Sequence, residues 1–240
     1  MESDDNNINK TNKINHPKEY WYEKRAKYWA SKEPTLNSVL GGYEESHLPD
    51  IKCSCELLNG LILSKQLNPQ KALDCATGIG RVTENVLLNF INEIDLVDNN
   101  EKFIDKCKNK FNLNNKVKDI YLSDLQIFKF KKKYDLIWIQ WCLENLEDDD
   151  LDIFLNECYS HLNDGGKIIV KENLCDIDDD EKGENDYAFG YSEVDFSKQR
   201  PDAFYINLFM KNKFKINLHF LNPNWPENMV PVCIYVLSKK

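Results

Sequence analysis

The sequence predicts an α/β protein: a seven-stranded, mostly parallel, Rossmann-like sheet with an N-terminal helical cap and an antiparallel terminal strand pair. Apolar runs of strand length alternate with amphipathic helical segments from residue 71 to residue 173. A glycine-containing turn follows the first of these runs. Near the carboxyl end, two strand-like runs are separated only by a loop, which indicates an antiparallel pair.

The N-terminal part of the chain carries helical rather than strand patterns. Residues 1–17 are polar and rich in asparagine, lysine and aspartate, and we expect a disordered tail there. Aromatic residues set among charges over residues 19–29 predict an amphipathic helix, and residues 50–62 predict another after a break at Gly41 and Gly42. Residues 18–65 therefore form the predicted helical cap, and residues 66–240 form the domain that contains the sheet.

The elements of the predicted sheet follow in order. Strands are expected at residues 71–76, 93–98, 117–124, 134–141 and 165–173, with helices at 81–90, 100–111 and 150–162 between them. An acidic loop at residues 175–186, with seven acids and one lysine, reads by default as a solvated insertion. A helix near 200–212 and strands at 214–222 and 231–239 complete the chain.

Composition excludes several classes of function. The net charge of -9 and the pI of about 5.1 argue against duplex nucleic acid as a ligand. No apolar run reaches the roughly 20 residues of a membrane span. Cys53 and Cys55 lack a second pair at zinc spacing, so we expect no metal site. The other cysteines lie mostly in apolar runs, which favours the cytoplasm and/or nucleus.

The turn after the first predicted strand indicates a cofactor site. Gly78 and Gly80 let the backbone approach a ligand, and the helix that follows offers unpaired N–H groups. Asp98, about 20 residues later at the end of the second strand, suits a ribose diol, although it could instead cap the next helix. Leu125 and Gln126 follow the third strand and could flank an adenine ring. In a doubly wound sheet these strand ends meet in one crevice.

Residues 74–80 have the pattern D-x-(small)-x-G-x-G, which resembles the first motif of class I S-adenosylmethionine-dependent methyltransferases. Members of that class usually carry glycine where Ala76 stands. The segments VLGGY (39–43), YDLIWIQW (134–141) and GGKIIVKEN (165–173) resemble, more specifically, the α-N-terminal protein methyltransferases. The resemblance covers residues 20–240. It implies S-adenosylmethionine as cofactor and, as substrates, the α-amines of proteins that begin Xaa-Pro-Lys or Xaa-Pro-Arg.

The resemblance also assigns site residues. Cofactor contacts fall on Trp29, Ala76, Gly78, Arg81, Asp98, Asn99, Asn100, Leu125, Gln126 and Gln140. Substrate contacts fall on Leu40, Trp141 and Ser197, and the catalytic residues are Asn145, Asn173 and Asp195. Tyr28 and Trp29 are expected to close the cap over both ligands.

The chain departs from the family at the position of the expected base. A free α-amine has a pKa of about 7.7–8.0, so it must lose a proton before it can attack a methyl group. The family usually has histidine where this chain has Asn145, glycine where it has Glu144, and a second acid where it has Ser192. An amide cannot take up a proton at neutral pH. The base is therefore expected to be Asp195, or Glu144 if its side chain faces the site.

Two other functions fit the same sequence. One is a methyltransferase of small amines on the same fold. The other is a non-catalytic, cofactor-binding protein whose acidic surface docks basic partners, a reading that the loss of histidine at Asn145 favours. We expect the partners to be protein N-terminal peptides, with no nucleic acid and no membrane, and we expect a monomer.

Overall fold

The computed structural model describes residues 8–9, 17–175 and 190–240. Most of the tail expected at residues 1–17 and most of the acidic loop at 175–186 lie outside the described residues. Within the tail, residues 8–9 form a two-residue strand, β1 (Ile8–Asn9).

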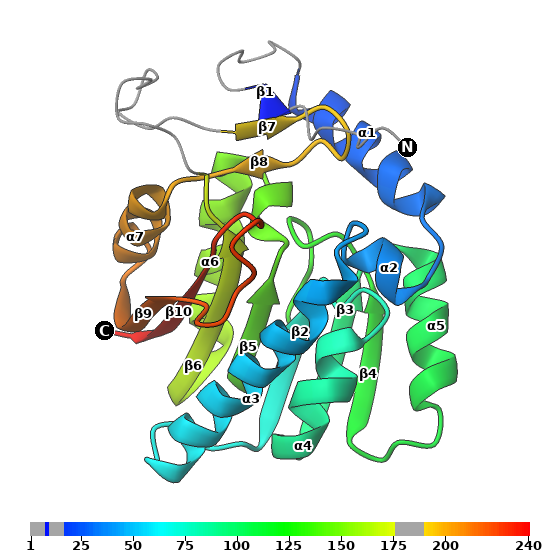
Figure 1. The fold of residues 1–240 in the computed structure, drawn as a ribbon. Helices are drawn as coiled ribbons and strands as arrows, with labels where there is room; N and C mark the ends of the chain where they lie inside the picture. The colour runs from blue at the N-terminus through cyan, green and yellow to red at the C-terminus, as the bar shows by residue number, and fades with distance from the viewer. Residues whose placement is uncertain (1–7, 10–16, 176–189) are drawn as a thin grey trace.

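The main sheet has seven strands in the order β4-β3-β2-β5-β6-β10-β9 (Figure 1). They are β2 (Lys71–Cys75), β3 (Glu93–Asp98), β4 (Val117–Leu122), β5 (Tyr134–Gln140), β6 (Leu162–Asn173), β9 (Phe214–Leu221) and β10 (Val232–Lys239). Neighbours pair in parallel except at β10, which is antiparallel to both β6 and β9. The predicted seven-stranded α/β sheet and its antiparallel terminal pair are confirmed.

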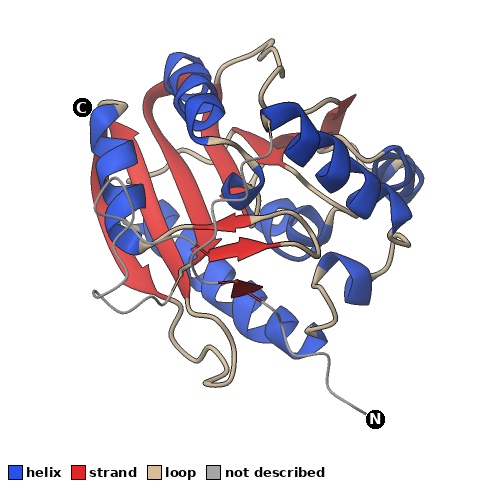
Figure 2. Cartoon of the chain, turned by 90° about the horizontal axis from the view of Figure 1, so that it is seen from above, coloured by secondary structure: helices blue, strands red, loops and turns tan. Residues whose placement is uncertain are grey.

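Helices cover both faces of this sheet (Figure 2). One face packs on α3 (His47–Leu63), α4 (Leu88–Phe90) and α5 (Glu101–Phe111), and the other packs on α6 (Asp148–His161) and α7 (Asp202–Lys211). Successive strand residues alternate between the two layers: Leu73 lies in the cluster with α6, and Ala72 in the cluster with α3. Every residue of β5 is buried, as expected for a parallel strand covered on both faces.

The N-terminal helices occupy two different places. α3, which the sequence placed in the cap, packs directly on the sheet, where Leu58 and Leu61 share a buried cluster with Trp138 and Ile169. In contrast, α1 (Lys18–Ser31) lies above the carboxyl ends of the strands, beside a small sheet of β1, β7 (Gly190–Ser192) and β8 (Lys198–Gln199) (Figure 1). The short helices α2 (Leu36–Val39) and η1 (Glu44–Ser46) connect α1 to α3.

The helix predicted at residues 81–90 is irregular. Its middle is a π-helical segment, η2 (Thr83–Leu87), and only the last residues form α4. The side-chain amide of Asn85 donates to the carbonyl of Arg81 at 2.8 Å. This bond competes with the backbone N–H that would close the α-helical turn, a local effect that apolar periodicity does not reveal.

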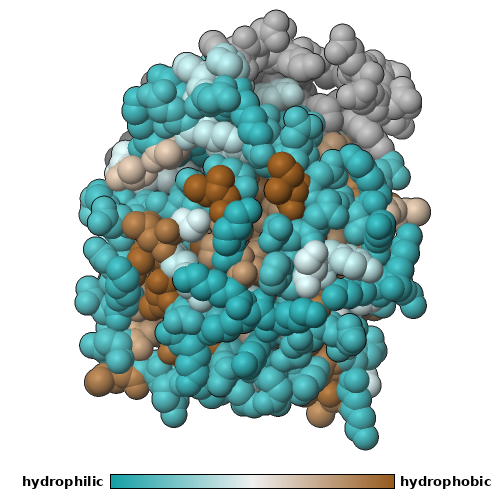
Figure 3. All heavy atoms as spheres, turned by 180° about the vertical axis from the view of Figure 1, so that it is seen from behind, coloured by the Kyte–Doolittle hydropathy of each residue, from teal (hydrophilic) through white to brown (hydrophobic). Residues whose placement is uncertain are grey.

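The face of the molecule in Figure 3 is mostly hydrophilic, and its apolar residues form small, separate patches. Among the described helices, none has both the length and the apolar composition that crossing a membrane requires.

Candidate active site

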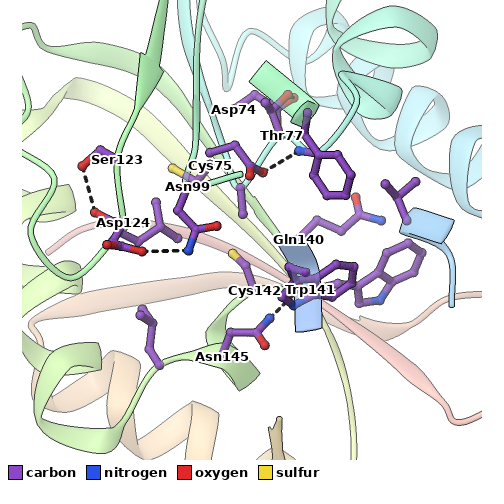
Figure 4. Close-up of a pocket in the computed structure, with 18 of the residues that line it drawn as sticks. Asp74, Cys75, Thr77, Asn99, Ser123, Asp124, Gln140, Trp141, Cys142 and Asn145 are labelled. Atoms are coloured by element: carbon purple, nitrogen blue, oxygen red, sulfur yellow. Dashed lines mark hydrogen bonds between the residues drawn. The ribbon is translucent and has the colours of Figure 1, made fainter. Parts of the chain in front are cut away.

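A cavity of about 240 Å³ lies at the carboxyl ends of β2, β3 and β5, and residues of α1 line it from the other side. The predicted site residues that line it, several of them labelled in Figure 4, are Trp29, Ala76, Gly78, Arg81, Asp98, Asn99, Leu125, Gln126, Gln140, Trp141 and Asn145. The predicted site residues outside this lining are Leu40, Asn100, Asn173, Asp195 and Ser197. Leu40 is buried directly after α2, and Asn173 is the last residue of β6.

Asp74 and Gly80 fix the turn that follows β2. Asp74 Oδ2 accepts hydrogen bonds from the hydroxyls of Thr77 and Thr83, at 2.8 and 2.6 Å. Burial raises the pKa of Asp74 to about 6. Gly80 has a φ of 72°, and a Cβ atom there would lie 2.6 Å from a ring carbon of Phe111. Only glycine fits this position, because both the backbone conformation and the packing against α5 exclude a side chain.

Asp98 ends β3 at the edge of the cavity. Its Oδ2 accepts a hydrogen bond from Gly78 N and its Oδ1 accepts one from Asn100 N, both at 2.8 Å. Burial raises the pKa of Asp98 to about 6 despite these bonds. Each oxygen keeps a lone pair that a ribose hydroxyl can use. Asn100 itself caps α5 and donates to the carbonyl of Trp29 at 2.7 Å, so it fastens α1.

Arg81 presents to the cavity an N–H donor that is unpaired within the described part of the chain. Its Nη2 pairs with Asp50 at 2.8 Å, and its guanidinium lies over the ring of Trp141, 5.1 Å from the centroid. Its Nη1 is buried and has no hydrogen-bond partner among the described residues. A buried donor without an acceptor is costly, and the carboxylate of an amino-acid-bearing cofactor would satisfy it. The residues present therefore fit S-adenosylmethionine.

A buried polar network beneath the cavity centres on Asp50. Gln140 Nε2 donates to both oxygens of Asp50 at 2.9 Å, and Trp138 Nε1 donates to Gln140 Oε1 at 3.0 Å. Lys171 forms an ion pair with Asp50 and donates to Ser54 Oγ at 2.8 Å. Burial by itself would raise the pKa of Asp50. The positive charges of Lys171 and, to a smaller extent, Arg81 outweigh burial and hold the pKa of Asp50 below its ordinary value. The network joins α3, β5 and β6 and fixes the Gln140 side chain.

The opposite side of the cavity is formed by the turn after β4. Ser123 N donates to the carbonyl of Asp98 at 2.9 Å, so the ends of β3 and β4 are tied together. Asn99 Nδ2 donates to Asp124 Oδ1 at 2.7 Å (Figure 4). Leu125 and Gln126 follow on the cavity wall, and their contact with an adenine ring stays a prediction.

The turn after β5 is held in place by β6. Trp141 has a left-handed φ of 53°, which for a residue with a side chain costs roughly 1–2 kcal/mol. Its backbone N donates to the carbonyl of Lys171 at 2.9 Å. Glu172 Oε1 accepts from the backbone N of Cys142 and of Leu143, at 2.8 and 2.7 Å. These bonds support the strained turn from below.

Three buried polar atoms of this turn have no hydrogen-bond partner among the described residues: Trp141 Nε1, Glu144 Oε2 and Asn145 Oδ1. Asn145 does donate from Nδ2 to the carbonyl of Trp141, at 3.5 Å (Figure 4). Burial, together with the negative charge of Asp195, raises the pKa of Glu144 to about 7. One donor and two acceptors left unpaired beside the cavity can bind a peptide carbonyl and an amine.

The segment between β7 and β8 contributes Asp195 and Ser197. Asp195 Oδ1 accepts from Ser197 N at 3.2 Å and from Ser197 Oγ at 2.9 Å. Arg25 of α1 donates from Nε to the carbonyl of Phe196 at 2.8 Å, and from Nη1 to the carbonyl of Asn145. Arg25 therefore joins this segment to the turn after β5.

The helix α1 forms a lid over the cavity. Tyr22 OH donates to Asp150 Oδ2 at 2.5 Å and accepts from Glu147 N at 3.1 Å. Lys18 pairs with Asp150 at 2.6 Å. Because Ala26 and Trp29 on the same helix line the cavity, these contacts hold the lid closed against α6.

Two residues of the buried network are not among the predicted site residues. Asp50 and Lys171 act through partners that only the fold brings together. A signal for Lys171 and Glu172 was present, since two charged residues directly follow the apolar run of a strand covered on both faces.

The strand order, the glycine turn and the cavity at the strand ends define a class I S-adenosylmethionine-dependent methyltransferase. More specifically, the chain belongs to the family of AdoMet-dependent proline di-methyltransferases, whose model matches residues 17–238. The family resemblance and the cofactor expected from the sequence are confirmed.

Individual relatives agree with this family. The chain is 32% identical over 234 residues to alpha N-terminal protein methyltransferase 1 of Dictyostelium discoideum. The matched region covers 95% of this chain and 83% of the relative. It is 37% identical over 158 residues to N-terminal Xaa-Pro-Lys N-methyltransferase 1 of Danio rerio, covering 64% and 71%. A solved S-adenosylmethionine-dependent methyltransferase from Leishmania major superposes with a TM-score of 0.82 at 29% identity, covering 91% of this chain and 83% of that one.

Proposed function

We propose that the protein transfers a methyl group from S-adenosylmethionine to the α-amino group of proteins that begin Xaa-Pro-Lys or Xaa-Pro-Arg. The observation that carries this proposal is the set of unpaired, buried polar atoms on Trp141, Glu144 and Asn145 beside the cofactor cavity. A donor next to acceptors fits a peptide N-terminus, in which the amine and the first carbonyl are neighbours. The name of the Danio rerio relative supports the choice of peptide class.

The cofactor would be held by the groups that line the cavity. Arg81 Nη1 would bind its carboxylate, Asp98 would accept from the ribose hydroxyls, and Leu125 and Gln126 would flank the adenine. Ala76 and Gly78 would bring the backbone close, while Gln140 and Trp29 would bound the site from the floor and the lid. When bound, S-adenosylmethionine supplies an electrophilic methyl group on a positively charged sulfur.

The chain's own residues would prepare the amine. Trp141 would wall the first residues of the peptide, and Asn145 and Asn173 would orient the nitrogen. The amine arrives mostly protonated, since its pKa is about 7.7–8.0, so a carboxylate must take its proton before the lone pair can react. Asp195 is the candidate base that the family resemblance indicates, and Ser197 holds its carboxylate.

A peptide assay tests the proposal. Matched peptides that begin Ser-Pro-Lys and Ser-Ala-Lys are incubated with the protein and S-adenosylmethionine, and mass spectrometry follows the mass gained per methyl group. We expect gain on the proline peptide only. If the protein binds S-adenosylhomocysteine in calorimetry but modifies neither peptide, the proposed function is wrong. Turnover of a small amine in place of the peptides would favour the small-molecule alternative.

A further inference from the structure

Glu144 is a buried carboxyl group that lies between the two residues proposed to orient the amine. It belongs to the short turn η3 (Leu143–Asn145) and is only 9% exposed. Asn173, at the end of β6, hydrogen-bonds its side chain, and Asn145 is its neighbour in the chain. Its Oε2 atom is buried and has no partner in the described parts of the chain. A buried acceptor left open in this way indicates a ligand that donates a hydrogen bond.

Titratable groups from the surrounding elements act on Glu144. These are Arg25, Cys142, Glu172, Asp195, Arg200 and Tyr205. The two arginines favour its ionised form, and the two acids oppose it. Arg25 is bonded to the carbonyls of Phe196 and Asn145, and Arg200 is bonded to Asp148 and to the carbonyls of Leu143 and Leu146. Burial raises the pKa of Cys142 and of Tyr205 well above the ordinary values, so both are neutral at neutral pH.

Glu172 is a second buried acid next to Glu144. Burial and the neighbouring Glu144 raise the pKa of Glu172 well above its ordinary value. Two neighbouring buried acids oppose each other's ionisation, and here the shift favours the protonated form of Glu172. Burial and Asp195 raise the pKa of Glu144 to about 7, which is close to that of an α-amine. A proton passes most readily between groups with similar pKa values.

Asp195 is occupied in a different way. Its Oδ1 atom accepts both the backbone N and the hydroxyl of Ser197, bonds that shape the segment between β7 and β8. Asp195 therefore positions the segment between β7 and β8, whereas Glu144 keeps a buried oxygen that has no partner among the described residues.

We propose that Glu144, and not Asp195, is the proton acceptor that prepares the substrate amine for methylation. This inference rests on the proposed function. The ammonium group of the peptide passes one proton to the Glu144 carboxylate, which leaves a neutral amine. The nitrogen lone pair then forms the new N–C bond, and the electron pair of the S–C bond stays on sulfur. The product is a methylated ammonium group and S-adenosylhomocysteine, and Glu144 returns its proton to solvent.

The test compares the full-length protein with Glu144→Gln, Glu144→Asp and Asp195→Asn. For each variant, kcat on the Ser-Pro-Lys peptide is measured from pH 5.5 to about 9, a range that brackets the ionisation of both groups. Calorimetry with S-adenosylhomocysteine checks that the cofactor site is intact, since Glu144 does not line that cavity. Carboxyl ¹³C NMR of the S-adenosylhomocysteine complex follows the ionisation of Glu144 without any turnover.

We expect E144Q to lower kcat by about 10²–10⁴-fold and to lose the acid limb near pH 7, with S-adenosylhomocysteine affinity unchanged within about threefold. E144D should keep the limb at a reduced rate, because it keeps a carboxyl group. D195N should keep the limb and mainly raise KM. An NMR resonance that titrates near pH 7 should vanish in E144Q.

Different results overturn different claims. If E144Q keeps the wild-type acid limb, or if D195N removes it, Glu144 is not the proton acceptor although the peptide is a substrate. If the wild type modifies no peptide at all, the proposed function fails, and this inference fails with it.

Discussion

Replacing Asp50 by asparagine would test whether the buried network under the cavity both stabilises the fold and holds the cofactor site. Asp50 and Lys171 are each fully buried, and their ion pair links α3 to β6. The substitution keeps the shape of the side chain but removes its charge. Lys171 would then keep only neutral partners, Ser54 Oγ and the backbone carbonyl of residue 50.

The magnitude follows from the uncompensated charge. Removing one member of a buried ion pair typically costs about 3–5 kcal/mol, far more than the loss of an exposed pair. Removing both members costs less than the two single changes added together, because no lone charge stays behind. We therefore expect a free-energy loss of about 3–5 kcal/mol for D50N, and an interaction energy of about 2–3 kcal/mol with Lys171→Met.

The assay is urea unfolding at pH 7.5, followed by tryptophan fluorescence, for wild type, D50N, K171M and the double variant. Glu23→Gln is the matched control, because the pair of Glu23 with Lys27 lies on the surface, and its unfolding midpoint should not move. The folded pKa of Asp50 is lowered, so its contribution is present above the unfolded pKa and is lost as the pH falls through the folded one. The D50N difference should therefore shrink in acid.

A D50N variant as stable as the wild type would refute the reasoning about the buried charge. Additive losses in the double variant would show that Asp50 and Lys171 act independently. Reduced stability with unchanged S-adenosylhomocysteine affinity would show that the network does not position Arg81 and Gln140 for the cofactor.

Three further changes probe the cofactor site. Arg81→Met should weaken S-adenosylhomocysteine binding by about 10–100-fold in calorimetry, because a charge-assisted hydrogen bond is lost; unchanged affinity would mean that Nη1 does not meet the carboxylate. The pKa of Asp98 is raised to about 6, and its protonated form loses charge as a ribose acceptor, so binding should be about tenfold weaker at pH 5 than at pH 7.5; Asp98→Asn should remove most of this dependence. Ala76→Gly should raise the free energy of unfolding in urea by about 0.5–1 kcal/mol, because Ala76 has a left-handed φ of 52° that glycine adopts without strain; a loss of stability would show that its methyl group packs usefully.

Much of the cofactor site can be predicted from local features of the sequence. The bounds predicted for the strand at residues 93–98 agree with those of β3. The prediction succeeds because the strand is a short apolar run that ends in Asp98. Gly78 and Gly80 also predict the turn after β2. The strand ends then had to converge, since parallel strands in this topology place their carboxyl ends on one edge.

The substrate side was less accessible from the sequence. Asp195, Ser197 and Asn173 were assigned through the family resemblance alone, and their roles stay predictions. The lid contacts of Arg25 with the carbonyls of Asn145 and Phe196 join segments more than a hundred residues apart. The sequence pattern of α1 does not predict these contacts, because Arg25 is one of several charged residues on an amphipathic helix.

The α/β alternation, the glycine turn and the carboxylate at the end of β3 can be predicted from the sequence, since each depends on residues close together in the chain. Which charged groups are buried together follows only from the fold. Asp50 of α3 meets Lys171 of β6, and burial together with the charge of Asp195 raises the pKa of Glu144. Ionisation depends on the distance to other charges and to water, and both distances exist only after the chain has folded.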